Sequence, residues 1–510
     1  MSWSRSASFW VSLLVSLSAC KPSPTLQVLG ESTRLSSAQP SPRQSAYFDG
    51  TSVRLRGARG ETLGLQLRVS DGRPRHIMLK LPAAAGVVSA FAVRSLQVSE
   101  PSSSMYGPST GAGTYPDLLE PSSSALTTEL AYFDVEIPAS AEPGRYDGRL
   151  WVDERALPVT LTISTAKIVL DREPLVWIFY LPKEIARVHG LPDGDAPELV
   201  EHEARYDALF RAHGAFLAAD LPPARFAARQ HMVRGVEYWP VAIDTSSDAA
   251  ITRDVQSWLE LFRGSGVTPF AIPVDEPRSA ADKQRARHIA EVMGRAGGGR
   301  PGLLRAVTDV EQASYGDSMD VFIAPGNFPD RARAGSGSGV RYWTYNGRPP
   351  QAGSMILDSD GAALRTWGWI AERYQVELWY AWEGLYFSDR YNRGGPTDVL
   401  RDPVTFDERS RGGSDWGNGD GLLAYPGPRA SLRLKALRRG LQDRLLLRQL
   451  RACASSAAAE RIAMRMVPRA LGEGQGAASW SIEEPVWEAA RQEVLDGIER
   501  GCHGQARLAQ

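Results

Sequence analysis

The sequence predicts a multidomain protein in which a β-sandwich is followed by an α/β (β/α)8 TIM-like barrel and a helical C-terminal extension. The length of 510 residues is too great for one ordinary domain. Short segments that alternate apolar and polar residues at period two dominate up to about residue 168, which is typical of a β-sandwich. From residue 169 to 450, strand and helix patterns alternate over roughly 280 residues, close to the usual size of a TIM-type barrel.

The N-terminus has the pattern of a lipoprotein signal peptide over residues 1–19. Arg5 supplies positive charge, and Phe9–Val15 is an apolar run too short to span a bilayer. Leu17-Ser18-Ala19-Cys20 resembles a bacterial lipobox, so we expect cleavage before Cys20 and lipidation of that cysteine. An ordinary secretory signal is the alternative. Lys21 follows the cysteine, and the absence of Asp at this position resembles lipoproteins that are sorted to the outer membrane. We therefore expect a lipid-anchored protein in the outer membrane, facing the periplasm or the cell surface.

Residues 20–45 are rich in Ser, Pro and Gln, which predicts a flexible tether. Residues 46–168 form the predicted sandwich, with the clearest alternation at 62–69 and 157–163 and further strands expected at 133–138 and 144–152. A Ser/Pro/Gly-rich loop over 100–124 interrupts them, and loops of that length are usually functional or disordered.

The predicted barrel covers residues 169–450. Its expected strands are 175–180, 267–274, 305–308, 321–324, 340–345 and 376–387, and its expected helices are 198–216, 254–262, 279–293 and 363–374. A Leu/Arg-rich helix over 432–450 closes the barrel, and residues 451–510 form the helical extension. Cys453 and Cys502 lie in this helical sequence of an exported chain, so we expect a disulfide between them.

The stretch Val267–Pro277 organises the chain, because an apolar strand ends there in two neighbouring carboxylates, Asp275 and Glu276. A helix with a capping-box spacing from Ser279 to Asp282 follows. Acidic residues before a helix often serve only as caps. The alternative is catalysis, since a (β/α) barrel carries its active site at the C-terminal ends of its strands.

Composition and the motifs that are absent exclude several classes of function. A formal net charge of -1 gives no electrostatic footprint for nucleic acid, whereas 14 tryptophans favour carbohydrate recognition mildly. The seven histidines show no metal-binding spacing, and residues 415–421 fail the EF-hand pattern at two ligand positions. The sequence also lacks a nucleophile elbow and a phosphate loop. We therefore expect no metal and no cofactor.

The order and spacing of several motifs resemble glycoside hydrolase family 123, the retaining β-N-acetylgalactosaminidases, and its uncharacterised bacterial relatives. These motifs are Tyr115–Leu119, Val135–Gly148, Asp275-Glu276-Pro277, Tyr342–Asn346, Leu378–Trp382 and Gly419–Gly427. The resemblance implies hydrolysis of terminal β-linked 2-acetamido sugars, with the acetamido oxygen as nucleophile. Asp275 would hold the acetamido N–H, and Glu276 would act as acid and then base, with a pKa raised by burial among aromatic side chains and by the charge of Asp275. The chain departs from the family around Thr344–Arg348, so the sugar stays open.

Further residues are expected to contact a glycan substrate. Tyr345, Asn346, Trp343, Tyr380 and Trp382 lie on or just after expected barrel strands, where C-terminal members wall a site and the others fill the core. Asp420 and Tyr425 belong to a Gly-rich turn, from which Asp420 would reach a sugar hydroxyl. Glu383, which follows an aromatic strand, is a rival acid. Two other functions stay open: a glycosidase of different sugar specificity, and a non-catalytic glycan-binding surface lipoprotein.

Overall fold

The computed structural model describes residues 25–38, 45–123, 125–170, 174–299, 302–324, 339–395, 397–475, 477 and 479–502. Cys20, the predicted signal peptide and much of the predicted tether lie outside the described residues. Among the helices in these ranges, none is long and apolar enough to cross a membrane.

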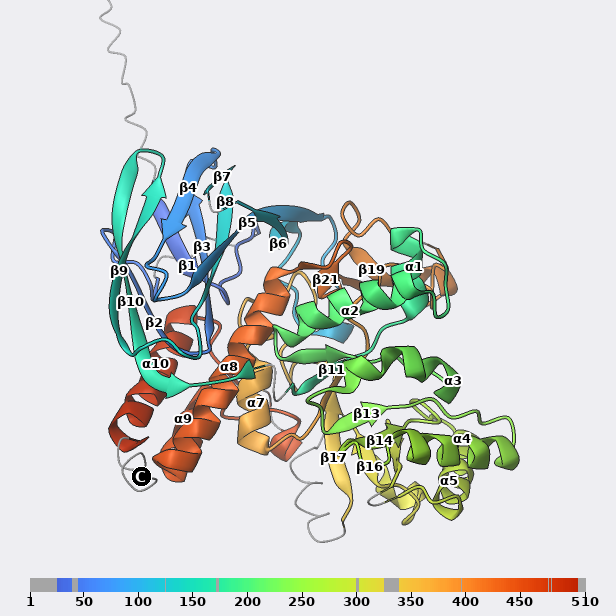
Figure 1. Ribbon diagram of the computed structural model, residues 1–510. Helices are drawn as coiled ribbons and strands as arrows, with labels where there is room; N and C mark the ends of the chain where they lie inside the picture. The colour runs from blue at the N-terminus through green and yellow to red at the C-terminus, as the bar shows by residue number, and fades with distance from the viewer. Residues whose placement is uncertain are drawn as a thin grey trace, which may run out of the picture.

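The N-terminal region is a sandwich of two five-stranded sheets (Figure 1), with strand orders β1-β3-β8-β5-β6 and β2-β10-β9-β4-β7. Alternate residues such as Leu63, Leu65 and Leu67 point into a closed apolar core between the sheets. The strands are β1 Leu26–Gly30, β2 Val53–Arg59, β3 Thr62–Val69, β4 Arg75–Lys80, β5 Val87–Val98, β6 Gly113–Ser122, β7 Ala125–Thr128, β8 Leu130–Glu136, β9 Gly144–Val152 and β10 Arg155–Lys167.

Two sequence predictions in this region are wrong. The predicted tether contains β1, which pairs antiparallel with β3, because an edge strand is held by a partner that lies far away in the sequence. The second half of the predicted loop 100–124 is strand β6, which pairs along β5 despite Pro116 and Pro121. The first half, residues 99–112, leaves the sandwich and contacts the second sheet-containing region: Ser102 Oγ donates to Asp358 Oδ1 at 2.6 Å, and Ser103 Oγ donates to Asp415 Oδ1 at 2.7 Å.

The second region is an eight-stranded sheet in the order β12-β11-β18-β17-β16-β15-β14-β13. Every pairing within it is parallel, and β18 joins β11, as in a (β/α)8 barrel. However, β12 and β13 are not hydrogen-bonded neighbours in the sheet, so the predicted complete barrel is not confirmed at this seam. Just beyond the two strands, the Ala242 N–H donates to the Leu221 carbonyl at 3.4 Å. The strands are β11 Val176–Ile178, β12 Ala215–Leu217, β13 Tyr238–Pro240, β14 Thr268–Ala271, β15 Leu304–Val307, β16 Val321–Ile323, β17 Arg341–Tyr345 and β18 Trp379–Ala381.

The connections between these strands are unequal. Regular helices cover some of them, whereas the described link from β15 to β16 contains only the short turn η4 Gln312–Ser314. After β18 the chain runs through two small hairpins, β19 Val404–Asp407 with β20 Trp416–Asn418 and β21 Ala424–Tyr425 with β22 Arg429–Ala430. The barrel helices are α1 Pro182–His189, α2 Pro197–Arg211, α3 Pro223–Phe226, α4 Asp248–Leu261, α5 Ala280–Arg295 and α7 Thr366–Tyr374; the remaining short turns are η1 Ser104–Tyr106, η3 Ala227–Val233, η5 Glu408–Arg411 and η6 Glu473–Gln475.

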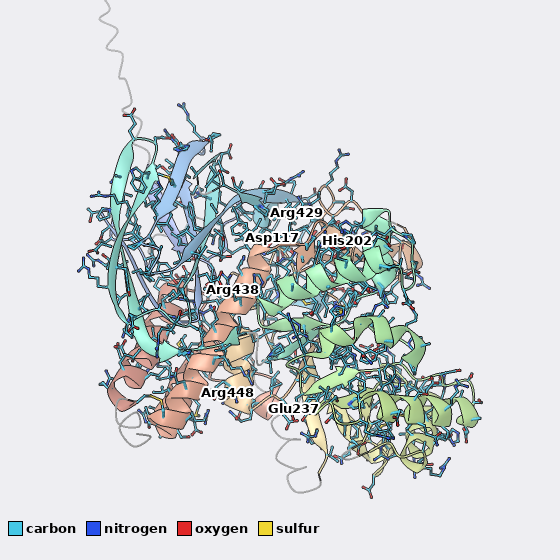
Figure 2. All side chains as sticks on the ribbon, viewed as in Figure 1. Asp117, His202, Glu237, Arg429, Arg438 and Arg448 are labelled. Atoms are coloured by element: carbon cyan, nitrogen blue, oxygen red, sulfur yellow. A yellow bond between two sulfur atoms is a disulfide. The ribbon has the colours of Figure 1, made fainter. Side chains whose placement is uncertain are left out.

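Helix α8, Leu432–Cys453, lies between the sandwich and the barrel sheet (Figure 1). The helix is buried on several faces, so its charged side chains as well as its apolar side chains pack against other parts of the protein. Arg433 donates to Asp117 Oδ2 at 3.0 Å, and Lys435 donates to Asp134 Oδ2 at 2.6 Å, so the cations of α8 pair with carboxylates of the sandwich. Figure 2 places Asp117 and Arg438 along this junction. A buried cation with a hydrogen-bonded carboxylate partner avoids the cost of an isolated charge.

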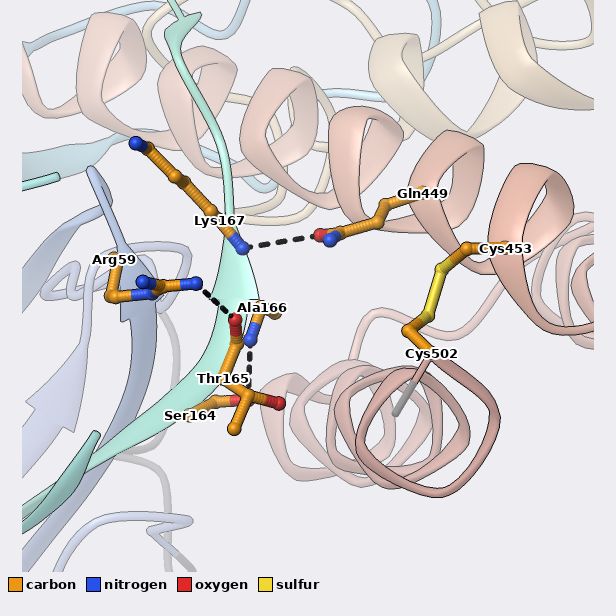
Figure 3. The surroundings of a disulfide bond; sticks show 8 residues. All are labelled: Arg59, Ser164, Thr165, Ala166, Lys167, Gln449, Cys453 and Cys502. Carbon is orange, nitrogen blue, oxygen red and sulfur yellow. Dashed lines mark hydrogen bonds between the residues drawn. A yellow bond between two sulfur atoms is a disulfide. The ribbon is translucent and has the colours of Figure 1, made fainter. Parts of the chain in front are cut away.

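The helical extension consists of α9 Ser456–Met466 and α10 Glu484–Gly501. A disulfide joins Cys453 at the end of α8 to Cys502, which follows α10, with a Cα–Cα distance of 5.3 Å (Figure 3). The last turn of α8 also contacts the sandwich, because the backbone N–H of Lys167 donates to Gln449 Oε1 at 3.2 Å. The disulfide therefore ties the end of the chain to the helix that joins the two sheet-containing regions.

Candidate active site

The two neighbouring carboxylates lie beyond the C-terminal end of β14. This strand ends at Ala271, and α5 begins at Ala280. The cap of α5 is Ser279, whose Oγ accepts from the Asp282 N–H, while Asp282 in turn accepts from the Ser279 N–H. The capping box thus needs neither Asp275 nor Glu276, and both side chains are exposed at this end of the barrel.

Thr308, just beyond β15, connects the backbone and side chain of the pair. Its hydroxyl donates to Asp275 Oδ1 at 2.6 Å and accepts from the backbone N–H of Glu276, also at 2.6 Å. Glu276 has φ of 42°, in the left-handed region that non-glycine residues seldom occupy. Backbone strain of this kind persists where surrounding contacts enforce it, and it clusters at functional sites. The bend frees the two neighbouring side chains from the opposite-face arrangement of a regular strand.

The Glu276 carboxylate is held from two sides. The Tyr345 hydroxyl donates to Glu276 Oε1 at 3.0 Å, and Arg278 donates to Oε2 at 2.9 Å. The side chain of Glu276 is 44% exposed, so the expected burial among aromatic side chains is not found. Asp275 is more enclosed: burial is the main cause that raises its pKa, the hydrogen bond from Thr308 opposes that rise, and the charge of Glu276 adds to it.

Three other predicted residues surround the same end of the barrel. Asn346, after β17, has φ of 52°, and its Oδ1 accepts from the backbone N–H of Trp382 at 2.9 Å. Tyr380 on β18 stacks on Trp177 with ring centroids 4.2 Å apart, and it contacts Tyr345 at 6.1 Å. Burial raises the pKa of the Tyr380 hydroxyl strongly, and the charges of Asp220, Asp275 and Glu383 add to that shift.

Asp420 extends the site toward the sandwich. Burial raises its pKa to about 7, while hydrogen bonds from Trp382 and Tyr106 act in the opposite direction. Tyr106 comes from the loop 99–112 of the sandwich, and its ring meets Phe406 edge-on at 6.0 Å. Arg348 donates to the backbone carbonyl of Met105 at 3.0 Å in the same loop. Sequence reasoning missed Tyr106, because only the long interrupting loop signalled that the sandwich contributes to this site.

The rival acid Glu383 is closed off. It is fully buried, and its Oε2 accepts from Arg390, whose guanidinium lies 4.6 Å from the Tyr386 ring centroid. Burial raises the pKa of Glu383 to about 8, and the positive charge of Arg390 opposes the rise. Without a rearrangement of Arg390, Glu383 does not face solvent.

The structure does not bring Trp343 and Tyr425 to the carboxylates. Trp343 is buried against Phe270 and Tyr238, and its indole N–H donates toward Glu377 at 3.3 Å, on the N-terminal side of β18. Tyr425 is buried beside α8 and donates to Asp117 Oδ2 at 2.7 Å. Within the described ranges, no group of three or more His, Cys, Asp or Glu side chains is arranged to hold a metal ion.

Two comparisons with known proteins point to one family. Residues 275–450 match the glycoside hydrolase 123 catalytic domain, and the match begins at the carboxylate pair. A solved family 123 glycoside hydrolase from Clostridium perfringens, described in terms of glycolipid glycan hydrolysis, is similar in fold, with a TM-score of 0.65 at 13% identity over 95% of this chain and 100% of that chain.

A glycosyl hydrolase family 2 member from Bacteroides cellulosilyticus matches at a TM-score of only 0.28 and 10% identity, over 70% of this chain and 44% of that chain, and carries no argument. No curated protein matches the sequence.

Proposed function

We propose that this chain, a member of glycoside hydrolase family 123 by its catalytic region, is a retaining glycosidase that removes terminal β-linked 2-acetamido-2-deoxy sugars, of the N-acetylgalactosamine type, from glycans. The observation that carries the proposal is the neighbouring pair Asp275 and Glu276, which leaves helix capping to Ser279 and is fixed by Thr308 and Tyr345.

A substrate-assisted reaction suits this pair. The acetamido oxygen of the sugar attacks C1, the glycosidic bond breaks, and Glu276 gives its proton to the leaving oxygen. Asp275 accepts the acetamido N–H and thereby stabilises the positive charge of the oxazolinium ion. Glu276 then removes a proton from a water molecule while that water attacks C1. The attack opens the oxazolinium ring, and the configuration at C1 is retained overall. Exposure of Glu276 supports this role, because the acid must meet both the leaving group and water.

The other residues support positioning. Tyr345 lies where its hydroxyl can move from Glu276 to the acetamido oxygen, and Asn346 fixes the backbone of Trp382. Trp382 and Tyr380 are half-buried aromatic side chains that suit stacking on a sugar ring. Asp420 is only 4% exposed, so we assign it, with Tyr106, to holding the Trp382 indole in place rather than to a sugar hydroxyl.

The test is hydrolysis of aryl β-N-acetylgalactosaminide and aryl β-N-acetylglucosaminide by the wild type, Glu276→Gln and Asp275→Asn. Loss of a positioned acid should lower the rate about 10²- to 10⁴-fold on a leaving group that needs protonation. A thiazoline analogue of the oxazoline should inhibit, and the 2-deoxy substrate without an acetamido group should not be cleaved. Full activity of Glu276→Gln would refute its role as acid. Cleavage of the 2-deoxy substrate would favour a glycosidase of other specificity, and binding without cleavage a glycan-binding protein.

We also propose that the protein is exported and anchored to the outer membrane by lipid on Cys20. The support is the lipobox-like sequence Leu17–Cys20 after a short apolar segment. Mass spectrometry of the protein purified from membranes should find a lipidated N-terminal cysteine, and Cys20→Ala should release the chain from the membrane fraction. A membrane-bound Cys20→Ala protein would contradict the anchor.

A further inference from the structure

Aromatic side chains that follow β18 are in continuous contact with one another, from the candidate site outward to solvent. The aromatic wall, as we call it, consists of Trp382, Tyr386, Tyr391 and Phe406. The ring centroid of Trp382 lies 4.9 Å from that of Tyr386 and 6.1 Å from that of Tyr391. Phe406 meets Trp382 edge-on at 6.1 Å, and Tyr386 stacks with Tyr391 at an interplanar angle of 19°. Tyr391 is 50% exposed, whereas Tyr386 is buried, so Tyr391 is the outer end of the wall.

The turn that carries Tyr391 is fixed by a buried carboxylate. Asp389 Oδ1 accepts from the Tyr386 hydroxyl at 3.0 Å, and its Oδ2 accepts from the backbone N–H of Asp407 at 2.7 Å. The guanidinium of Arg390 lies 4.6 Å from the ring centroid of Tyr386 and 5.1 Å from that of Tyr391. An exposed ring that is already held in place loses little conformational freedom when it binds a ligand.

The aromatic wall lies on the Glu276 side of the carboxylate pair. Asp275 accepts from a hydroxyl beyond β15, whereas Glu276 accepts from Tyr345 of β17. Asn346 follows Tyr345 directly, and its Oδ1 accepts from the backbone N–H of Trp382 at 2.9 Å. In the proposed reaction Asp275 meets the acetamido group of the terminal sugar and Glu276 meets the leaving oxygen. The wall is therefore on the side to which the leaving group departs.

We propose that the aromatic wall binds the second sugar of the glycan, the one that leaves with the glycosidic oxygen, and that Tyr391 stacks on the ring of this sugar. The inference rests on the proposed function, because the role of Glu276 as acid defines the side of the leaving group. The C–H groups on one face of a sugar ring carry partial positive charge, and they pack against the negative face of an aromatic ring. The preferred substrate is accordingly an oligosaccharide rather than a glycoside with a small leaving group.

The test compares two substrates with the same terminal sugar: a disaccharide of N-acetylgalactosamine β-linked to galactose, and methyl β-N-acetylgalactosaminide. Both leaving groups are alcohols that need a proton from Glu276, but only galactose has a ring that can stack. Tyr391→Ala should lower kcat/KM on the disaccharide about 5- to 20-fold, the effect of one lost aromatic contact. On the methyl glycoside the same variant should change kcat/KM less than about twofold, because a contact that is absent cannot be lost.

Two control variants accompany Tyr391→Ala. Tyr391→Phe keeps the ring and should retain the wild-type kcat/KM on both substrates. Ile482→Ala removes an equally exposed apolar side chain, 62% exposed, from the helical extension, and it should also match the wild type. Melting temperatures of all variants should agree, because Asp389 rather than the Tyr391 ring fixes the turn. An equal loss on the two substrates, or no loss on the disaccharide, would overturn the role of Tyr391.

Failure of the proposed function has a different signature, namely no release by the wild type from either substrate or from the aryl glycosides. In that case calorimetry with the disaccharide and with free N-acetylgalactosamine decides. Tighter binding of the disaccharide than of the monosaccharide to the wild type, with the difference lost in Tyr391→Ala, supports the contact. Equal affinities for the two sugars, a difference that survives in Tyr391→Ala, or no binding overturns it.

Discussion

Thr308 is a small residue with two tasks at the carboxylate pair. Its hydroxyl donates to Asp275 and accepts from the backbone of Glu276, so a single side chain fixes one carboxylate and holds the left-handed bend at the other. Its hydrogen bond also opposes the rise in the pKa of Asp275 that burial causes.

We predict that Thr308→Val lowers kcat/KM about tenfold, the effect of one lost hydrogen bond at the reacting centre. Because a group that lowers the pKa of Asp275 is removed, that pKa rises and the acidic limb of the pH–rate profile moves to higher pH. Thr308→Ser keeps the hydroxyl and should retain the wild-type profile. A valine variant with an unshifted acidic limb would show that the hydroxyl does not act on Asp275.

Sequence reasoning selects residues that stand in a recognisable pattern. Asp275 and Glu276 end an apolar strand in front of a capped helix, and that arrangement is visible in the sequence. Thr308 and Tyr106 are missed because each is a common residue type whose importance depends on partners from distant segments of the chain. Trp343 was expected at the site from its place on a strand, yet only the three-dimensional structure shows which side chains face the barrel interior.

Among the elements, helices were predicted more closely than the short barrel strands. Residues 432–450 and 363–374 were expected as helices, and α8 and α7 occupy Leu432–Cys453 and Thr366–Tyr374. By contrast, the expected strand 376–387 contains only the three-residue strand β18. Helical hydrogen bonds are local, so the sequence indicates them, whereas a strand ends where its neighbours cease to pair with it.

The link between α8 and α10 allows a prediction about stability. The disulfide closes a loop with a sequence separation of 49 residues, and the loop-entropy relation gives up to about 4 kcal/mol for such a loop. We expect the Cys453→Ser/Cys502→Ser double variant to unfold at lower urea concentration, with a free energy of unfolding lower by about 2–4 kcal/mol. Dithiothreitol should shift the wild type but not the variant. A wild type that ignores the reductant would show that the bond is absent or carries no stability.

At the scale of the whole molecule, the junction between the sandwich and the barrel consists of buried charges. Arg439 of α8 is 1% exposed and donates to Glu61 of the sandwich at 2.8 Å and to Glu488 of α10 at 3.2 Å. Removal of one partner from a buried pair leaves the other charge without compensation, which costs about 3–5 kcal/mol.

We therefore predict that Arg439→Met lowers the free energy of unfolding by about 3 kcal/mol in urea titrations. Arg461→Met is the matched control, because Arg461 is an exposed residue of α9, and its effect should stay within about 0.5 kcal/mol. Equal unfolding midpoints for the two variants would contradict this prediction. They would mean that the other cations around Glu61 and Glu488 compensate the negative charges of these two carboxylates without Arg439.

The unpaired seam between β12 and β13 was not foreseeable, because the alternation of strands and helices is the same for an open and a closed barrel. Only the hydrogen-bond pairing between strands distinguishes an open barrel from a closed one. The multidomain organisation, with a sheet-rich N-terminal part and a helical C-terminal part, was predicted correctly.

The charged helix α8 also bears on how this gene can change during evolution. Two of its cations pair with carboxylates encoded more than 300 positions earlier, with separations of 316 between Arg433 and Asp117 and 301 between Lys435 and Asp134. Recombination that exchanged the sandwich for another module would leave these buried cations without partners, so we expect the two halves to be inherited as one unit. Compensating substitutions at the junction should accordingly occur in pairs, and a barrel of this type that has lost its sandwich should have replaced the arginines of α8 with apolar residues.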